Sequence, residues 1–297
     1  MSAIDSFSGV FNLAIYVFLF SSVYRTAGQD TFKFQSRADR GDWNYIYPMT
    51  YLNKLALFKS EESILSLFRR EEVKDHLNIR AFLNAYKSCF WKDDIKALPE
   101  YRKPFIVVEG NNLTARRELS KRLSGHHNVG RVFNPPQCLF GWSRIFPRGD
   151  LLKKASFQLG LYAAAFTVRQ WLNKGLPVFM DGYWTDQASY IIARIYKTID
   201  DLPKKGSPMY EEPEDLMLPD LVLYLDFEMK HLDRFSNYSS NIDFDAINKV
   251  IYSNFKYTPV AIVKVPNDMQ DAFDIVMEVI QSKLSKQYDL TPAKPKV

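Results

Sequence analysis

The fold follows from the segment Phe105-Ile106-Val107-Val108-Glu109-Gly110-Asn111-Asn112-Leu113-Thr114-Ala115-Arg116-Arg117-Glu118. Its first four residues form an uninterrupted apolar run, which is typical of a buried strand, and the residues after Ala115 have the composition of a helix. A strand that runs into a glycine and continues as a helix has the outline of a phosphate-binding loop. The segment therefore predicts an α/β protein with a site at this turn.

The residues of the turn depart from the phosphate-binding pattern. That pattern requires Gly-Lys-Ser/Thr about five residues after the first glycine: the glycine lets amides approach the phosphates, the lysine bridges them and the hydroxyl holds Mg²⁺. Here the three positions are Ala115, Arg116 and Arg117. Two alternatives are open, a nucleotide kinase or the fold of one without its reaction.

The composition indicates a folded chain rather than a disordered one. Of 297 residues, 46% are hydrophobic and 25% are charged. The net charge of +5 suits an anionic small ligand or an acidic membrane surface, but the charges are dispersed, so no nucleic-acid partner is expected. Cys89 and Cys138 stand in unrelated contexts and are expected to be buried free thiols. Neither they nor the histidines have metal-ligand spacing, so no protein-bound metal site is predicted.

The sequence does not settle the role of the N-terminal region. Residues 10–24 form an apolar run shorter than the ~20 residues of a bilayer span, and a membrane-associated or buried helix and a targeting segment are both open. Residues 25–100 show helical periodicity and are expected to form a helical N-terminal extension. An Asn-x-Thr pattern at Asn112 favours an intracellular or organellar protein, because a glycan there would obstruct the turn.

Strands and helices alternate over residues 101–286, which are expected to form one α/β domain. The candidate strands are 105–109, 177–181, 221–226 and 260–265, and the candidate helices are 115–124, 150–173, 185–199, 228–235, 243–255 and 268–286. Strands this apolar fit a parallel sheet with both faces covered. Ligands of such sheets bind at the carboxyl ends of the strands, so Glu109, Asp181 and Asp226 are expected at one rim. Residues 287–297 are expected to be a mobile tail.

Several blocks of sequence, taken in order, resemble the thymidylate kinase superfamily and most closely its mitochondrial UMP-CMP kinase 2 branch. The blocks are 135–138 with 142–146, 157–162, 178–184 with 188–193, and 213–223. The resemblance begins at Phe105 and does not extend to residues 1–100. It implies a three-layer P-loop nucleoside monophosphate kinase-like fold, a mitochondrial location and, as often in this superfamily, a homodimer. Cytoplasmic placement, or membrane association through residues 10–24, stays open.

The resemblance also implies ATP and Mg²⁺ as cofactors and transfer of a phosphoryl group to a pyrimidine nucleoside monophosphate. The matching cofactor-binding residues are Gly110, Asn111, Asn112, Thr114, Ala115, Arg116 and Arg117. The matching substrate-binding residues are Glu109, Arg144, Tyr183, Trp184 and Arg234. The catalytic positions match Arg116 and Asp181.

The departures from the family pattern fall on charge-neutralising groups. Asn112 stands for an aspartate, and Gly182 stands for the arginine that is implied to clamp the acceptor phosphate. Arg117 replaces a Mg²⁺-binding hydroxyl although a guanidinium has no acceptor. We therefore predict impaired catalysis, a pseudokinase. The alternatives are a divergent active kinase in which Arg116 serves for lysine, and a membrane-associated adaptor.

Overall fold

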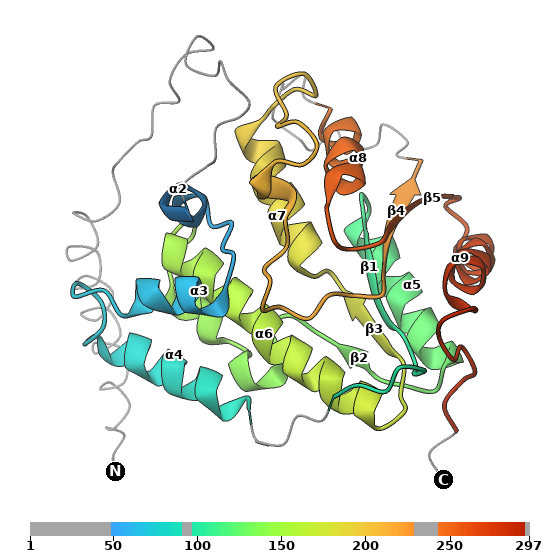
Figure 1. The fold of residues 1–297 in the computed structure, drawn as a ribbon, viewed down its shortest axis with the longest axis horizontal. Coiled ribbons are helices and arrows are strands. Elements are labelled where there is room, and N and C mark those ends of the chain that lie inside the picture. Colours follow the sequence, from blue (N-terminus) through green and yellow to red (C-terminus); the bar gives the residue numbers. More distant parts are fainter. Residues whose placement is uncertain (1–48, 91–96, 229–242, 295–297) are drawn as a thin grey trace, which may run out of the picture. The chain divides into compact units, whose positions relative to one another are not determined.

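The computed structural model describes residues 49–90, 97–228 and 243–294. One five-stranded sheet has the order β2-β3-β1-β4-β5, and all neighbouring strands run parallel (Figure 1). The strands are β1 (Phe105–Gly110), β2 (Arg131–Val132), β3 (Val178–Asp181), β4 (Leu221–Phe227) and β5 (Val260–Val265). The sequence predicted four of these strands. It missed β2, because two residues are too few to show a periodicity.

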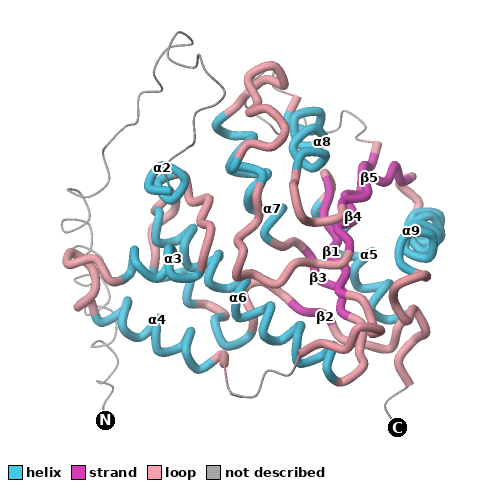
Figure 2. The backbone as a smooth tube through the Cα atoms, in the orientation of Figure 1, coloured by secondary structure: helices cyan, strands magenta, loops and turns pink. Residues whose placement is uncertain are grey.

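Helices cover both faces of the sheet. One face carries α5 (Leu113–His126) and α9 (Met269–Leu284), and the other carries α6 (Leu151–Asn173), α7 (Trp184–Ile195) and α8 (Phe244–Asn254). Figure 2 shows the strands between these groups, with α9 on one side and α6 and α7 on the other. The predicted three-layer α/β fold with a parallel sheet is confirmed. The helix expected at 228–235 lies almost entirely outside the described residues.

The alternation of side chains along β1 divides the core into two parts. Phe105 and Val107 join the cluster formed with α6, α7 and α8, whereas Ile106 and Val108 join the cluster formed with α5 and α9. All four side chains are fully buried. The central strand is therefore fixed from both faces, and its carboxyl end is held in a defined place.

Three helices precede the sheet and share the core of the α6 face. They are α2 (Met49–Lys54), α3 (Glu61–Phe68) and α4 (Leu77–Ser88). Ser60 begins α3 with a capping box, and Phe68 and Phe82 pack their rings against Phe146 at 5.9 and 5.4 Å. Phe146 follows η3 (Trp142–Ile145) in the connection between β2 and α6. Residues 49–90 thus extend the domain's own core.

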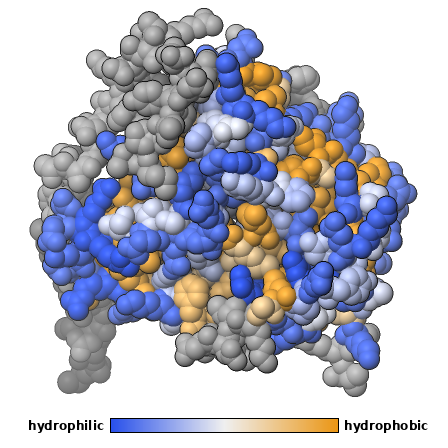
Figure 3. Space-filling model, in the orientation of Figure 1, coloured by the Kyte–Doolittle hydropathy of each residue, from blue (hydrophilic) through white to orange (hydrophobic). Residues whose placement is uncertain are grey.

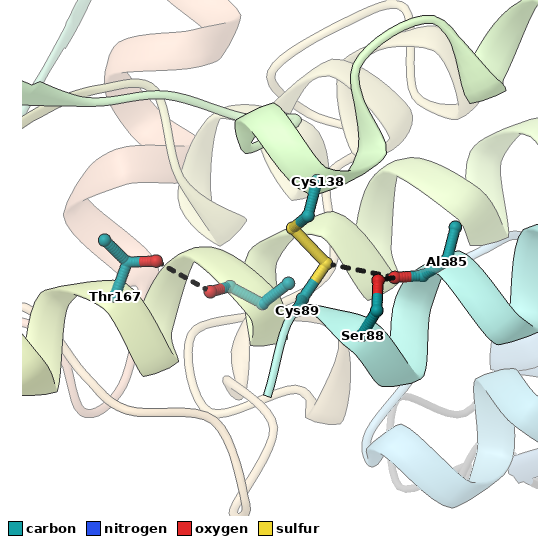
Figure 4. The surroundings of a disulfide bond; sticks show 6 residues. Ala85, Ser88, Cys89, Cys138 and Thr167 are labelled. Atoms are coloured by element: carbon teal, nitrogen blue, oxygen red, sulfur yellow. Dashed lines mark hydrogen bonds between the residues drawn. A yellow bond between two sulfur atoms is a disulfide. The ribbon is translucent and has the colours of Figure 1, made fainter. Parts of the chain in front are cut away.

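The two cysteines correct an expectation drawn from the sequence. Cys89 at the end of α4 and Cys138 in η2 (Gln137–Leu139) form a disulfide with a Cα–Cα distance of 5.6 Å (Figure 4). They were expected to be free thiols because 49 positions separate them, but the fold brings α4 beside η2. The bond joins the N-terminal helices to the segment that follows β2.

The described part of the C-terminal tail is also held, where the sequence predicted a mobile segment. Asp289 lies 2.8 Å from the ammonium of Lys103, and the amide of Ala293 donates to the carbonyl of His127 at 3.1 Å. The composition of residues 287–297 predicted mobility because composition does not show contacts between residues that are distant in the sequence. The tail through residue 294 therefore packs on the domain.

None of the described helices is both long and apolar enough to cross a membrane. Residues 10–24, which the sequence left open as a membrane-associated segment, lie outside the described residues.

On the face drawn in Figure 3, apolar residues form separate groups among hydrophilic ones. The remaining short helix, η4 (Pro208–Tyr210), lies in the connection between α7 and β4.

Candidate functional site

Gly110 ends β1 where the chain passes close to β4. Its φ is +146°, and a Cβ at this position would lie 2.3 Å from the carbonyl oxygen of Leu225. The next amide, that of Asn111, donates to the same carbonyl at 3.2 Å. The absence of a side chain at Gly110 therefore allows the end of β1 to lie close to β4.

Helix α5 begins at Leu113, directly after a capping residue. The side-chain oxygen of Asn112 accepts from the amide of Ala115 at 3.1 Å, and its carbonyl accepts from the amide of Arg116 at 3.0 Å. Asparagine is a preferred N-cap because its short side chain satisfies an otherwise unpaired amide. Two amides of the turn are thus bonded within the helix terminus.

Arg116 reaches from α5 to the carboxyl end of β3 and to α7. Its Nε lies 2.8 Å from Asp181 and its Nη1 lies 2.7 Å from Asp186. Only 9% of the residue is exposed. Burial acts to lower the pKa of Arg116, but the carboxylates of Asp186 and Asp181 outweigh this effect and raise the pKa further. The guanidinium is therefore charged and held by two carboxylates.

Asp181 binds a second arginine from the same helix. Its Oδ2 lies 3.2 Å from Nε of Arg117, while its Oδ1 faces Arg116. The Arg117 side chain is 62% exposed, so this pair is the weaker of the two. Oδ2 of Asp181 therefore accepts a hydrogen bond from Arg117, whereas Oδ1 lies in a charge contact with Arg116 that does not have hydrogen-bond geometry.

Gly182 provides the space in which this ion-pair network lies. It has a φ of +74°, and a Cβ there would lie 3.1 Å from Asp186 Oδ2 and 3.4 Å from Nη2 of Arg116. The position that would carry the acceptor-clamping arginine, according to the resemblance, is thus beside the guanidinium of Arg116. A larger residue at Gly182 would press on the ion pair between Arg116 and Asp186.

Glu109 lies fully buried beneath the network. Its two oxygens accept from the Tyr183 amide, the Thr185 hydroxyl and the Tyr252 hydroxyl, each at 2.7 Å. Burial and the charge of Asp186 raise the pKa of Glu109 to about 7, against the opposing hydrogen bonds. The carboxyl group therefore holds the start of α7 in place from the protein interior.

A cavity of about 1140 Å³ opens beside the network, between α5, α6 and α7. Its lining holds more cations than carboxylates. The cations are Arg116, Arg117, Lys121, Arg131, Lys153, Lys154 and Arg194, and the carboxylates are Glu118, Asp150, Asp181 and Asp186. Apart from Arg116 and Arg117, none of these cations has a carboxylate partner within 4.0 Å among the described residues. The cavity is therefore suited to an anionic ligand.

Aromatic rings accompany the cations at the cavity wall. The guanidinium of Arg131 lies 4.9 Å from the ring of Phe133, and that of Arg194 lies 4.3 Å from the ring of Tyr190. Phe133 and Tyr190 are about half exposed. Planar groups of this kind can stack on a ring-bearing ligand.

The residues predicted for the cofactor divide between this cavity and the sheet. Thr114, Arg116 and Arg117 line the cavity. Asn111 instead donates to the carbonyl of Phe227 at 2.9 Å and to Asp245 at 3.1 Å. Gly110, Asn112 and Ala115 belong to the turn and the helix cap described above.

The residues predicted for the substrate are also divided. Tyr183 lines the cavity and donates its hydroxyl to the carbonyl of Met217. Arg144 lies exposed in η3 and does not line the cavity. Trp184 is buried against Phe255. Arg234 lies outside the described residues.

Sequence reasoning missed several residues that make the site. Asp186, Lys121, Arg131 and Gln158 line the cavity, and none belonged to the predicted set. One available signal was the spacing of Arg117 and Lys121, which lie four residues apart and so share a helix face. Asp186 offered no such signal, because its partner Arg116 is distant in the chain.

Comparisons with known proteins give a likeness over part of the chain. No protein-family model matches the chain. Over 147 residues, 49% of this chain, it is 30% identical to the human protein UMP-CMP kinase 2, mitochondrial. The matched region is nucleoside monophosphate kinase-like. It spans 32% of that relative's length.

A solved structure gives a weaker likeness. Thymidylate kinase from Candida albicans matches the kinase-like chain with a TM-score of 0.44 and 17% sequence identity, over 61% of this chain and 92% of that one. A likeness of this size carries no argument about the site.

Proposed function

We propose that this chain binds a pyrimidine nucleoside monophosphate in the cavity between α5, α6 and α7 and transfers phosphoryl groups poorly or not at all. The observation that carries the proposal is the engagement of Arg116 with Asp181 and Asp186. This arginine stands where a kinase of the related type would place the cation that bridges transferring phosphates. A cation already paired with two carboxylates has little charge left to stabilise a transition state.

ATP and Mg²⁺, which the relationship implies, fit the described residues poorly. The amides of Ala115 and Arg116 are bonded to Asn112, so they are not free to surround a phosphate. Both oxygens of Asp181 face guanidinium groups rather than a metal site. Among the described residues, no three His, Cys, Asp or Glu side chains gather as metal ligands.

Releasing Arg116 for catalysis would be costly. Breaking one partner away from a buried ion pair typically costs about 3–5 kcal/mol, because the remaining charge is left without compensation. A barrier increase of ~4 kcal/mol slows a reaction roughly a thousandfold. Slow or absent transfer is what this arrangement favours.

Binding to the cavity is supported by its charge. Lys121, Arg131, Lys153 and Lys154 come from three parts of the chain and offer donors to a phosphate. The choice of a pyrimidine monophosphate rests on the relationship to UMP-CMP kinase 2. A mitochondrial location belongs to the same proposal, since that relative carries the location in its name.

The proposal is tested by measuring transfer and binding separately on the full chain. With ATP, Mg²⁺ and CMP, UMP or dTMP, we expect ADP release no faster than with Asp181→Ala. Turnover that Asp181→Ala abolishes would contradict impaired catalysis. In calorimetry with CMP and UMP, Lys153→Ala should weaken binding about tenfold, whereas Lys174→Ala, exposed at the far end of α6, should not. No binding by the wild-type chain would reject the cavity as a nucleotide site.

A further inference from the structure

Gln158 is a buried polar residue that no contact among the described residues accounts for. It is only 1% exposed, and its Nε2 has no hydrogen-bond partner among the described residues. Buried amide donors are nearly always paired in folded proteins, because leaving one unpaired destabilises the fold. Gln158 lines the cavity. Nε2 itself has less than 1 Å² of accessible surface, so a ligand in the cavity could supply the missing acceptor once the carboxamide turns toward it.

Two other buried side chains that carry N–H donors lie away from the cavity. The indole nitrogen of Trp184 also lacks a partner among the described residues, but Trp184 does not line the cavity. Gln170, a second buried glutamine on α6, is likewise absent from the cavity lining. Nε of Arg116 lies at the cavity and also has no hydrogen-bond partner among the described residues, but it lies 2.8 Å from Asp181, whereas Nε2 of Gln158 has neither a hydrogen bond nor an ion pair.

In the first half of α6, the charged residues that line the cavity come one helical turn before the less exposed, uncharged ones. Lys153 and Phe157 are four residues apart, as are Lys154 and Gln158, so each pair shares one face of the helix. Exposure falls along this face, from exposed Lys154 to buried Gln158. Four residues of helix rise ~6 Å, about the span of a pentose. The face thus presents ammonium groups toward the mouth and a ring and a carboxamide one turn deeper.

A second amide side chain, that of Asn134, also belongs to the cavity lining. Asn134 donates its Nδ2 to the carbonyl of Phe157 at 3.2 Å, which determines the orientation of its side chain. Its Oδ1 has no hydrogen-bond partner among the described residues. Gly160 leaves the room for it, since a Cβ there would lie 2.3 Å from that oxygen. The cavity lining therefore offers one unpaired donor and one unpaired acceptor close to Phe157.

We propose that Gln158 is a specificity-determining residue that reads the base of a pyrimidine nucleoside monophosphate. Its Nε2 donates to a carbonyl oxygen or ring nitrogen of the base, while Lys153 and Lys154 face the phosphate. This inference rests on the proposed function, because it names the part of the ligand that the same cavity recognises. Ligands that carry the phosphate without the base should be insensitive to residue 158.

The test uses calorimetry of the full chain with CMP, UMP and ribose 5-phosphate. Gln158→Leu should weaken CMP and UMP binding about five- to tenfold, the effect of one lost hydrogen bond, and leave ribose 5-phosphate unchanged. Gln170→Leu is the matched control, the same substitution on the same helix away from the cavity, and should change none of the three. Gln158→Met, which keeps the length of the side chain, should repeat the result if the leucine variant folds poorly.

The outcomes separate this inference from the proposed function. If the wild-type chain binds CMP or UMP and both Gln158 variants bind equally well, Gln158 does not read the base, and the cavity remains a nucleotide site. Equal weakening of ribose 5-phosphate and CMP would indicate a packing role and overturn the inference. If the wild-type chain binds neither nucleotide, both proposals fail.

Discussion

Nη1 of Arg116 lies 2.7 Å from Oδ1 of Asp186, and this ion pair joins the first turn of α5 to the first turn of α7. These two helices follow β1 and β3, which are neighbours in the sheet. The pair therefore links the carboxyl ends of adjacent strands, where ligands of parallel sheets bind. At this place the carboxylates and guanidinium groups pair with one another, and the cavity-lining cations without a carboxylate partner among the described residues lie on α5, β2, α6 and α7.

Arg116→Ala should destabilise the fold by about 3 kcal/mol. The side chain of Asp181 is only 10% exposed, and the substitution removes the buried arginine that compensates its charge. Arg117→Ala is the matched control. It removes the second, 62% exposed arginine from Asp181 and should cost no more than about 1 kcal/mol. Urea unfolding followed by circular dichroism measures both values. Equal losses would mean that the buried pair contributes no more than the exposed one.

Glu109 should make the stability of the fold depend on pH. Burial and the charge of Asp186 raise the pKa of Glu109 to about 7, above its value near 4.5 in the unfolded chain. The folded state then binds the proton more tightly, so this contribution is fully present below about pH 4.5 and is lost as the pH rises to about 7. The size of the change is at most about 3 kcal/mol.

The measurement for this prediction is the difference between wild-type and Glu109→Gln unfolding free energies at several pH values. The wild-type advantage should shrink between about pH 4.5 and pH 7 and stay constant above pH 7. Taking the difference removes the contribution of the histidines to the free energy of unfolding, because they titrate in both proteins. A difference that does not change with pH would place the pKa of Glu109 at its ordinary value.

Removing the disulfide between Cys89 and Cys138 should lower the free energy of unfolding by ~2–4 kcal/mol. The bond closes a loop of 49 residues, which restricts the unfolded chain. Cys89→Ser combined with Cys138→Ser should give this loss in urea unfolding. Dithiothreitol should destabilise the wild-type protein by a similar amount and leave the double variant unaffected. A reductant effect on the double variant would point to another cause.

Gly182→Ala should cost more than the same change at a glycine with open surroundings. Both Gly182 and Gly141 have positive φ, +74° and +87°, so each substitution carries a backbone cost of about 1–2 kcal/mol. Only at Gly182 does the new Cβ meet other atoms, those of Asp186 and Arg116. We expect at least about 1 kcal/mol more for Gly182→Ala in thermal unfolding. Equal costs would show that the ion pair tolerates the methyl group.

The sheet could be predicted from the sequence because its central strands are long apolar runs. Residues 105–109 and 221–225 are buried, and short apolar runs bounded by turn residues are typical of strands in a sheet that is covered on both faces. The two-residue β2 carries no comparable pattern. Its place at the sheet edge follows from pairing with β3, which only the folded chain reveals.

The site was predicted less completely because its decisive contacts join distant residues. The sequence identified Arg116 and Asp181, but not that the two would pair with each other. Asp186 lies 70 residues from Arg116, and its role depends on how β1 and β3 are ordered. The same limit applies to Gln158, since a glutamine in an apolar helix gives no sign of whether its amide faces a cavity.

The bond between Cys89 and Cys138 has a practical consequence for handling the chain. A protease that cuts anywhere between these two positions yields two fragments that stay covalently joined. Such a nicked protein would keep its full mass on a non-reducing gel and separate into two bands only after a thiol is added. Gels run under both conditions are therefore needed to tell an intact chain from a cut one.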